Sequence, residues 1–366
     1  MKPAYYIGIM SGTSLDGVDA VLADFTTPSP QLLKTHFLPY DERLRSQLLA
    51  LHQAGINELH RAAMMSNELS VLYASAVNNL LKTSSLVPKD VIAVGCHGQT
   101  IRHCPEVEKG YTIQLVNAAL LAELTAVTVV VDFRSRDIAA GGQGAPLVPA
   151  FHQAVFMQPK YNRVILNIGG ISNITSLEPG KTITGFDCGP GNLLMDAWCL
   201  RHTGRPYDQD GEWASSGEVI PTLLEKLLSH LFFSLPPPKS TGRDMFNMTW
   251  LEQYLVGHEK PENVQATLLQ LTVQTISNSI LKYCPNSEKI YVCGGGARNG
   301  LLMSCLSGAL FEKSVGLTDQ LGVDADWVEA YAFAWLAQQT IMGVPSNLSV
   351  VTGAKGSRIL GAIYPV

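Results

Sequence analysis

Four glycine-rich segments of this sequence carry residue types that can bind phosphate and accept a proton. They cover residues 12–17, 167–173, 185–192 and 294–300. Glycine lets backbone N–H groups approach an anion, and hydroxyl groups donate to phosphate oxygens. A carboxylate can hold a magnesium ion or act as a general base. Together these groups suit the binding of a nucleoside triphosphate.

The first segment reads Gly-Thr-Ser-Leu-Asp-Gly and connects two expected strands. The hydroxyls of Thr13 and Ser14 suit phosphate oxygens, and the carboxylate of Asp16 suits magnesium, directly or through water. The spacing matches neither a Walker A loop nor a dinucleotide fingerprint. Because Asp-Gly and Ser/Thr are also ordinary hairpin residues, a plain turn is the alternative.

The third segment contains the candidate general base, Asp187. The turn Gly-Pro-Gly-Asn follows over residues 189–192 and is expected to lead into a helix over residues 193–200. Such a turn can direct backbone N–H groups at a phosphate. A carboxylate beside it acts as a base when it lies within hydrogen-bond reach of the proton. An Asx turn at Asp187 is the alternative.

The second and fourth segments suit other parts of a nucleotide. Residues 167–173 form a glycine turn whose polar side chains suit the phosphates, although a bulged hairpin also explains them. Residues 294–300 follow an apolar strand, and backbone without side chains can lie flat against a purine or ribose. A simple turn from strand to helix explains this pattern almost as well.

Charged residues outside these segments suggest contacts with a small charged substrate. Arg134 lies in the Arg- and Gly-rich residues 132–149, where it can bind a carboxylate in bidentate fashion or form a salt-bridged hinge. Glu329 lies among apolar residues of an expected helix, where an unpaired carboxylate is costly, so a polar ligand or a buried partner is implied. His97 and His103 do not have the spacing of a zinc site.

The elements that must position these residues follow from apolar periodicity and turn signals. A strand, a glycine turn and a second strand occur once in each half, which indicates an internal repeat, although chance similarity also explains it. We expect residues 91–94 to be a short strand that delivers residues 96–100 into a loop. The expected strands cover residues 5–10, 18–25, 91–94, 164–168, 171–177 and 289–293, and the expected helices 42–82 (two, divided near 55–57), 266–281, 299–310 and 327–342.

Length and composition exclude several classes of protein. A chain of 366 residues is expected to form two domains, and 46% hydrophobic with 16% charged residues is typical of globular cores. The net charge of -5 provides no basic surface for nucleic acid. We find no signal-peptide pattern and no membrane-spanning apolar run, which predicts a cytoplasmic protein without a membrane partner. The seven scattered cysteines are expected to be thiols rather than disulfides or zinc ligands.

In their order, these motifs resemble the anhydro-N-acetylmuramic acid kinase family of the sugar-kinase, heat-shock-ATPase and actin superfamily. The resemblance extends over nearly the whole chain. The motifs are specific together, but no single motif is specific alone. It rests on residues 8–19, 96–100, 132–149, 167–173, 187–192, 239–244 and 294–299.

This resemblance implies an α/β, two-lobed actin/hexokinase-like (ribonuclease H-like) ATPase fold with mixed sheets and an interdomain cleft. The N-terminal lobe would comprise residues 1–133 and about 343–366, and the C-terminal lobe about 134–342. The implied reaction belongs to bacterial cell-wall recycling. ATP and water would open the 1,6-anhydro ring of anhydro-N-acetylmuramic acid and phosphorylate O6, giving N-acetylmuramic acid 6-phosphate and ADP. ATP and Mg²⁺ are the implied cofactors, and a homodimer is compatible with the resemblance.

The resemblance also assigns roles to individual residues. Asp187 would activate the water, Asp16 would hold magnesium, and Gln99, Arg134 and Glu329 would contact the sugar. The implied ATP-binding residues are Gly12, Thr13, Ser14, Leu15, Asp16, Gly17, Val18, Asp19, Asn167, Gly169, Gly170, Gly189, Gly191, Asn192, Gly294, Gly295, Gly296 and Asn299. Cys188 departs from the family pattern, where we expect Thr, and a lost hydroxyl contact to phosphate would lower affinity or rate.

Two other functions fit the same motifs. One is a kinase for another sugar, in which Asp187 deprotonates a substrate hydroxyl. The other is an actin-like binding protein in which ATP controls assembly without chemistry on a small molecule. Sustained release of ADP that depends on the sugar distinguishes an enzyme from such a switch.

Overall fold

The computed structural model describes residues 3–12, 14–27 and 29–366 and divides into two compact units. Unit 1 comprises Met1–Val155 and Trp327–Val366, and unit 2 comprises Phe156–Asp326. The expected boundaries after residues 133 and 342 therefore differ from those of the structure. Helix α13 (Val328–Ile341) belongs to unit 1 because it packs on strands β1 (Tyr5–Ser11) and β4 (Val91–Cys104). Residues after 134 belong there because the Asp137 carboxylate accepts hydrogen bonds from Asn347 and Thr352.

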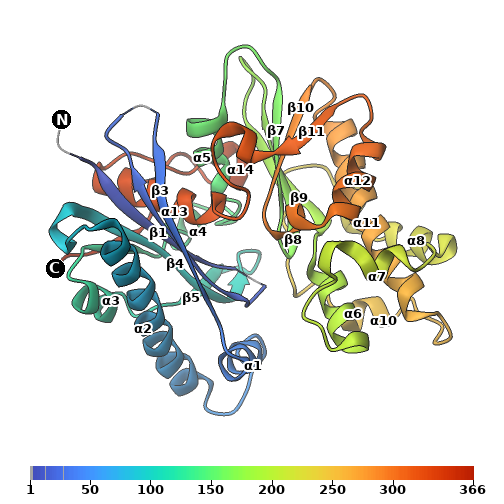
Figure 1. The fold of residues 1–366 in the computed structure, drawn as a ribbon, viewed down its shortest axis with the longest axis horizontal. Coiled ribbons are helices and arrows are strands. Elements are labelled where there is room, and N and C mark those ends of the chain that lie inside the picture. Colours follow the sequence, from blue (N-terminus) through green and yellow to red (C-terminus); the bar gives the residue numbers. More distant parts are fainter. Residues whose placement is uncertain (1–2, 13, 28) are drawn as a thin grey trace. The chain divides into compact units, whose positions relative to one another are not determined.

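Unit 1 is built on a mixed sheet with the strand order β12-β6-β4-β1-β2-β3, and β5 pairs with β4 (Figure 1). Strands β1, β2 and β3 are antiparallel neighbours, whereas β4 is parallel to both β1 and β6. The remaining elements of this unit are β2 (Gly17–Asp24), β3 (Gln31–Pro39), α1 (Glu42–Ala50), α2 (Glu58–Ser84), β5 (Tyr111–Leu115), α3 (Ala118–Thr125), β6 (Val129–Val131), α4 (Ser135–Ala139), α14 (Ser349–Thr352) and β12 (Ala362–Tyr364), with α5 (Val148–Phe156) at the unit boundary.

Side chains of β1 point alternately to the two faces of this sheet, and each face is covered by a helix. Ile7 and Ile9 are fully buried in the same core as residues of α2. Gly8 lies between them and faces α13, because side chains alternate across a strand. A Cβ on Gly8 would lie 1.9 Å from the Ala330 carbonyl oxygen, so α13 packs directly on the backbone of the sheet.

Unit 2 is built on a second mixed sheet with the strand order β11-β10-β7-β8-β9 (Figure 1). Strands β7, β8 and β9 are antiparallel neighbours, and β10 is parallel to β7 and β11. The elements are β7 (Arg163–Ile168), β8 (Ile171–Leu177), β9 (Thr184–Pro190), α6 (Leu193–Thr203), α7 (Glu212–Ser215), α8 (Pro221–Leu228), α9 (Leu231–Ser234), α10 (Met248–Glu252), α11 (Pro261–Tyr283), β10 (Lys289–Cys293), α12 (Gly300–Ala309) and β11 (Ser314–Leu317).

The two units repeat one strand order. In each sheet, a meander of three antiparallel strands is followed in the chain by two strands that extend the sheet in parallel from the first strand of the meander. The predicted repeat of strand, glycine turn and strand is thereby confirmed as β1–β2 and β7–β8. The predicted α/β class with mixed sheets is also confirmed.

One local prediction was wrong. Strand β4 does not end at Val94 but continues to Cys104, so residues 96–100 lie within a strand rather than a loop. Gln99 pairs with Ser11 of β1 on one side and Leu115 of β5 on the other. These long-range hydrogen-bond ladders extend a strand whose polar residues suggested a loop.

Among the described residues, which include all seven cysteines, there is no disulfide. None of the described helices has the length and apolar character needed to span a membrane.

Burial of His152 in α5 makes the stability of unit 1 depend on pH. Burial lowers the pKa of His152 from 6.5 to about 3. Between these two pKa values, His152 is therefore neutral in the folded state but protonated in the unfolded state. Its contribution is present above pH 6.5 and is lost as the pH falls towards 3. Between pH 7 and pH 5 we expect this residue to reduce the free energy of unfolding by about 2 kcal/mol.

This expectation can be tested by urea denaturation at pH 7 and pH 5. In His152→Gln, the decrease in stability between the two pH values should be about 2 kcal/mol smaller than in the unchanged chain. His60→Gln, which alters an exposed histidine of α2, is the control and should leave the decrease as it is. An unchanged decrease in His152→Gln would contradict the proposed cause.

Candidate active site

Two of the predicted segments meet at the end of β7 in unit 2. The turn at Gly169 and Gly170 joins β7 to β8, and its carbonyl groups accept hydrogen bonds from the turn that follows β9. Gly191 N–H donates to Gly170 O at 2.9 Å, and Asn192 N–H donates to Gly169 O at 2.8 Å. A Cβ on Gly191 would lie 2.3 Å from Gly169 O, so the two turns pack backbone against backbone.

These hydrogen bonds change the role expected for the turn after Asp187. The sequence suggested that its N–H groups point at a phosphate, but those of Gly191, Asn192 and Leu193 are bonded to Gly169 or Gly170. From α11, the Thr272 hydroxyl donates to the carbonyl oxygens of Pro190 and Gly191 at 3.1 and 3.0 Å. The turn thus holds the Gly169–Gly170 hairpin in place, and any contact with ATP must use other atoms.

The glycine loop after β10 joins the same cluster. Gly294 has a φ of 81°, and a Cβ there would lie 2.3 Å from the Asn167 side-chain oxygen. A Cβ on Gly296 would lie equally close, 2.3 Å from Ile168 Cγ2, whereas Gly295 is exposed. Asn299 caps α12, since its side-chain oxygen accepts a hydrogen bond from Leu302 N–H at 3.0 Å. The loop therefore presents bare backbone beside the end of β7.

Asn167 supplies a polar group suited to a ligand in this cluster. The residue is 6% exposed, and its Oδ1 accepts no hydrogen bond from the described residues. Leaving a buried acceptor unsatisfied is unfavourable by about 1–3 kcal/mol. A ligand hydroxyl or amine beside Gly294 would remove this penalty, so the cluster fits a nucleotide.

Asp187 lies in a row of polar residues across three strands. Asn167 of β7 pairs with Asn173 of β8, and Asn173 pairs with Asp187 of β9. Directly opposed residues place their side chains on the same face of the sheet. Asp187 is 9% exposed, and its Oδ2 accepts a hydrogen bond from Thr241 N–H at 2.8 Å. The sequence does not identify Asn173 as a neighbour of Asp187, because its place opposite Asp187 depends on strand register.

Cys188 lies in a packed environment rather than on an exposed surface. Cys188 is 1% exposed and lies near Ser279 of α11. Burial raises the pKa of the Cys188 thiol to about 12, so the thiol remains protonated at neutral pH. The departure from the expected Thr therefore affects a buried contact with α11.

In unit 1, the predicted phosphate loop is the turn between β1 and β2. Gln99 Nε2 donates to Gly12 O at 3.0 Å and fixes the start of this turn, and Ser14 donates to the Asp16 carboxylate at 2.7 Å. Ser14 and Asp16 are exposed, whereas the side chains of Leu15 and Val18 are buried in the core. The predicted ATP contact at Thr13 lies outside the described residues.

Arg134 is held from two sides in unit 1. Its Nε donates to His97 Nε2 at 3.0 Å, and its Nη1 donates to Gly144 O at 2.8 Å. Burial, followed by the charge of Arg134, lowers the pKa of His97 well below its ordinary value. His97 is therefore neutral and accepts at Nε2, which fixes the guanidinium. The ring of His97 packs 4.8 Å from Phe333 of α13, one helical turn after Glu329, which is half-buried.

Asp137 fixes the loop that carries Gly144. Its Oδ2 accepts from Gly144 N–H at 2.8 Å, while its Oδ1 accepts from Asn347 at 2.6 Å and from Thr352 at 2.7 Å. This carboxylate is fully buried. It therefore connects the loop beside Arg134 to the C-terminal part of the chain.

Few of the side chains that the structure describes are suited to hold magnesium. The described residues contain no cluster of three or more His, Cys, Asp or Glu side chains suited to a metal ion. Magnesium in kinases needs only one or two carboxylates, with substrate phosphates and water supplying the remaining ligands. The exposed carboxylate of Asp16 fits that requirement.

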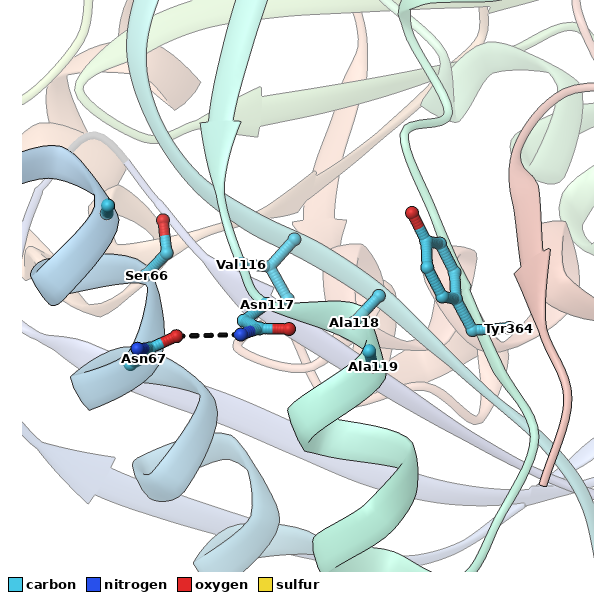
Figure 2. Close-up of a pocket in the computed structure, with 8 residues that line it drawn as sticks. Ser66, Asn67, Val116, Asn117, Ala118, Ala119 and Tyr364 are labelled. Atoms are coloured by element: carbon cyan, nitrogen blue, oxygen red, sulfur yellow. Dashed lines mark hydrogen bonds between the residues drawn. The ribbon is translucent and has the colours of Figure 1, made fainter. Parts of the chain in front are cut away.

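A cavity of about 460 Å³ lies elsewhere in unit 1, and none of the predicted site residues lines it (Figure 2). Figure 2 shows Asn67 of α2 and Asn117 before α3 directed at each other, with a hydrogen bond of 2.7 Å. Asn117 also caps α3 by accepting from Leu120 N–H at 3.1 Å. These two amides have a structural role.

Comparison with known proteins identifies the family. The family model described as anhydro-N-acetylmuramic acid kinase matches residues 4–366. The chain belongs to this family. It is 64% identical over 365 residues to the anhydro-N-acetylmuramic acid kinase of Nitrosospira multiformis, covering 100% of both chains. The identity to the protein of the same name from Nitrosomonas europaea is 63% over 361 residues, covering 99% of each, and to that from Thiobacillus denitrificans 53% over 364 residues, covering 98% of this chain and 97% of the relative.

Membership of this family confirms the kinase function that the resemblance implied. The chain is an ATP-dependent carbohydrate kinase, and its two mixed sheets fit the α/β class that the resemblance implied.

Proposed function

We propose that Asp187 activates a water molecule for attack on the anomeric carbon of 1,6-anhydro-N-acetylmuramic acid. As the water oxygen bonds to C1, the C1–O6 bond breaks and Asp187 receives a proton from water. The freed O6 bonds to the γ-phosphorus of ATP, and ADP leaves. The observation that supports this role is the buried Asp187 carboxylate, oriented by Thr241 N–H and aligned with Asn173 and Asn167.

The groups proposed to bind ATP have distinct roles. In unit 2, the exposed backbone at Gly295 would contact adenosine, and Asn167 Oδ1 would accept from a nucleotide hydroxyl or amine. In unit 1, Ser14 and Asp16 would act at the phosphates. Magnesium held by Asp16 would neutralise charge on the transferred phosphoryl group. Phosphoryl transfer depends mainly on such positioning and electrostatic stabilisation.

Arg134 is proposed to bind the carboxylate of the sugar substrate. Its Nε and Nη1 are fixed by His97 and Gly144, so less side-chain entropy is lost when the substrate binds. A planar guanidinium suits a carboxylate better than an amine does. Glu329 and Gln99 remain proposed sugar contacts, although the Gln99 amide nitrogen already donates to Gly12 O.

Isotope transfer tests this reaction directly. The protein is incubated with magnesium, ATP and 1,6-anhydro-N-acetylmuramic acid in oxygen-18 water, and the products are followed by mass spectrometry. We expect ADP and a phosphorylated sugar that carries the label at its anomeric hydroxyl, read before exchange with solvent. Absence of ADP release dependent on this sugar would contradict the substrate and favour a kinase of another sugar.

The cytoplasmic location and the homodimer stay predictions. Fractionation of cells that produce the protein and size-exclusion chromatography with light scattering would test them.

A further inference from the structure

Residues 239–244, read as Lys-Ser-Thr-Gly-Arg-Asp, form a segment that contacts Asp187 through the backbone and that we call the clamp segment. Asp187 N–H donates to Lys239 O at 3.1 Å, and Thr241 N–H donates to Asp187 Oδ2 at 2.8 Å. Both the backbone and the side chain of Asp187 are therefore bonded to one short segment.

The clamp segment is held at both ends by one aromatic cluster. Phe232 and Phe233 precede it, Phe246 and Trp250 follow it, and Phe246 is fully buried. The Phe246 ring lies 5.6 Å from Phe232, 5.5 Å from Phe233 and 5.0 Å from Trp250. Buried aromatic pairs of this kind stabilise a fixed backbone position beyond the area they bury.

Two further contacts connect this cluster to the residues beside Asp187. The Lys239 ammonium donates to Phe232 O at 3.1 Å and lies 4.5 Å from the centre of the Phe232 ring. Gly189, two residues after Asp187, has a φ of 142°, and a Cβ there would lie 2.6 Å from Phe233 Cε1. The same rings thus pack on the clamp segment and on the turn that follows Asp187.

We propose that the clamp segment is a positioning element for the reaction, in which the Thr241 N–H orients the Asp187 carboxylate and stabilises its ionised form. A hydrogen bond donated to a carboxylate favours the charged state, which is the state that accepts a proton from water. A backbone donor anchored by buried rings keeps its direction through the catalytic cycle, unlike a flexible side chain. This inference rests on the proposed function, in which Asp187 is the base.

A test of this proposal by pH dependence must leave the other ionisable residues around Asp187 unchanged, because their charges also affect its protonation. Burial lowers the pKa of Lys239, while the nearby Asp187 charge opposes that effect. The facing strand β8 contributes Asn173, which does not titrate. Further groups nearby include Arg243 and Asp244 of the clamp segment, Lys282 of α11 near Lys239, and the Cys188 and Cys284 thiols, whose pKa values burial raises to about 12 and about 11. In the aromatic cluster, the ring of His230 lies 5.4 Å from Phe246, and burial lowers the pKa of His230.

The test compares two forms of one variant that differ in a single backbone group. Thr241→Ala is made with an ordinary amide and with an ester between residues 240 and 241, introduced with lactic acid by nonsense suppression. The ester replaces the N–H of residue 241 by an oxygen and leaves every side chain unchanged, while the carbonyl group of residue 240 becomes a weaker acceptor. We expect the acid limb of the kcat/KM profile to lie about one pH unit higher in the ester form. We also expect kcat to be about tenfold lower, with the KM for ATP within about twofold.

Coincident pH profiles and equal kcat in the two forms would overturn the proposal. A loss of thermal stability without movement of the acid limb would indicate a purely structural role and would also overturn it. Thr241→Pro removes the same N–H by ordinary mutagenesis and should shift the limb in the same direction. Asp187→Asn separates the clamp proposal from the base role of Asp187. If Asp187→Asn is inactive but the ester and amide forms behave identically, only the clamp proposal is overturned. If Asp187→Asn has near-normal turnover, the base role and the clamp proposal are both overturned.

Discussion

Replacement of Asp187 by Asn is expected to lower turnover about a thousandfold or more while ATP still binds. Asn has nearly the same shape as Asp, and it can still accept the hydrogen bond from Thr241 N–H. It cannot take a proton from water, so the loss should fall on kcat and on kcat/KM alike. The rate is measured as ADP release dependent on the sugar, and ATP binding by titration calorimetry.

A matched control keeps the change of charge but moves it away from the proposed base. Glu225→Gln alters an exposed carboxylate on α8 of the same unit and should leave turnover within about twofold. Turnover of Asp187→Asn near that of the control would exclude Asp187 as the base. Loss of ATP binding in Asp187→Asn would instead show that this carboxylate acts in nucleotide binding.

Replacement of Arg134 by Ala is expected to raise the KM for the sugar about 10- to 100-fold, with little change in the KM for ATP. A charge-assisted hydrogen bond to a substrate carboxylate is worth about 1.5–3 kcal/mol, which corresponds to this factor. Steady-state kinetics with each substrate varied in turn provides the measurement. A 1,6-anhydro sugar without a carboxylate should be insensitive to the replacement.

Arg136 provides the matched control for this prediction. It lies on α4 two residues from Arg134 but is exposed, so Arg136→Ala should change either KM by less than about twofold. Equal effects of the two replacements would indicate a general effect of positive charge. An unchanged KM for the sugar in Arg134→Ala would remove Arg134 from the sugar site.

The elements that were predicted correctly are those with a strong local pattern. The hairpins β1–β2 and β7–β8, helix α11 and strand β10 follow from apolar periodicity bounded by glycine turns. The predictions that failed depend on contacts between distant residues. Strand β4 continues to Cys104 because β1 and β5 pair with it, and no local pattern in residues 96–100 indicates those partners.

In the candidate site, too, contacts between distant residues could not be predicted from the sequence. Glycine content and polar residues identified the turns around Gly169 and Gly191, but spacing alone did not show that one turn hydrogen-bonds to the other. Likewise, Asn173 faces Asp187 only because of the register between β8 and β9. The place of residues around Asp137 in unit 1 depends on its hydrogen-bond partners Asn347 and Thr352, which are 210 and 215 residues away.

The order of the two units along the chain has a consequence for folding during synthesis. Unit 2 is continuous and is complete once residue 326 has left the ribosome, whereas unit 1 requires α13 and residues up to Thr352. At about 5–20 residues per second, the β1 and β4 face that receives α13 remains uncovered for about 10–40 s after residue 155 is made. The unit that begins first therefore finishes last, and an exposed apolar sheet in the nascent chain is a natural target for chaperones.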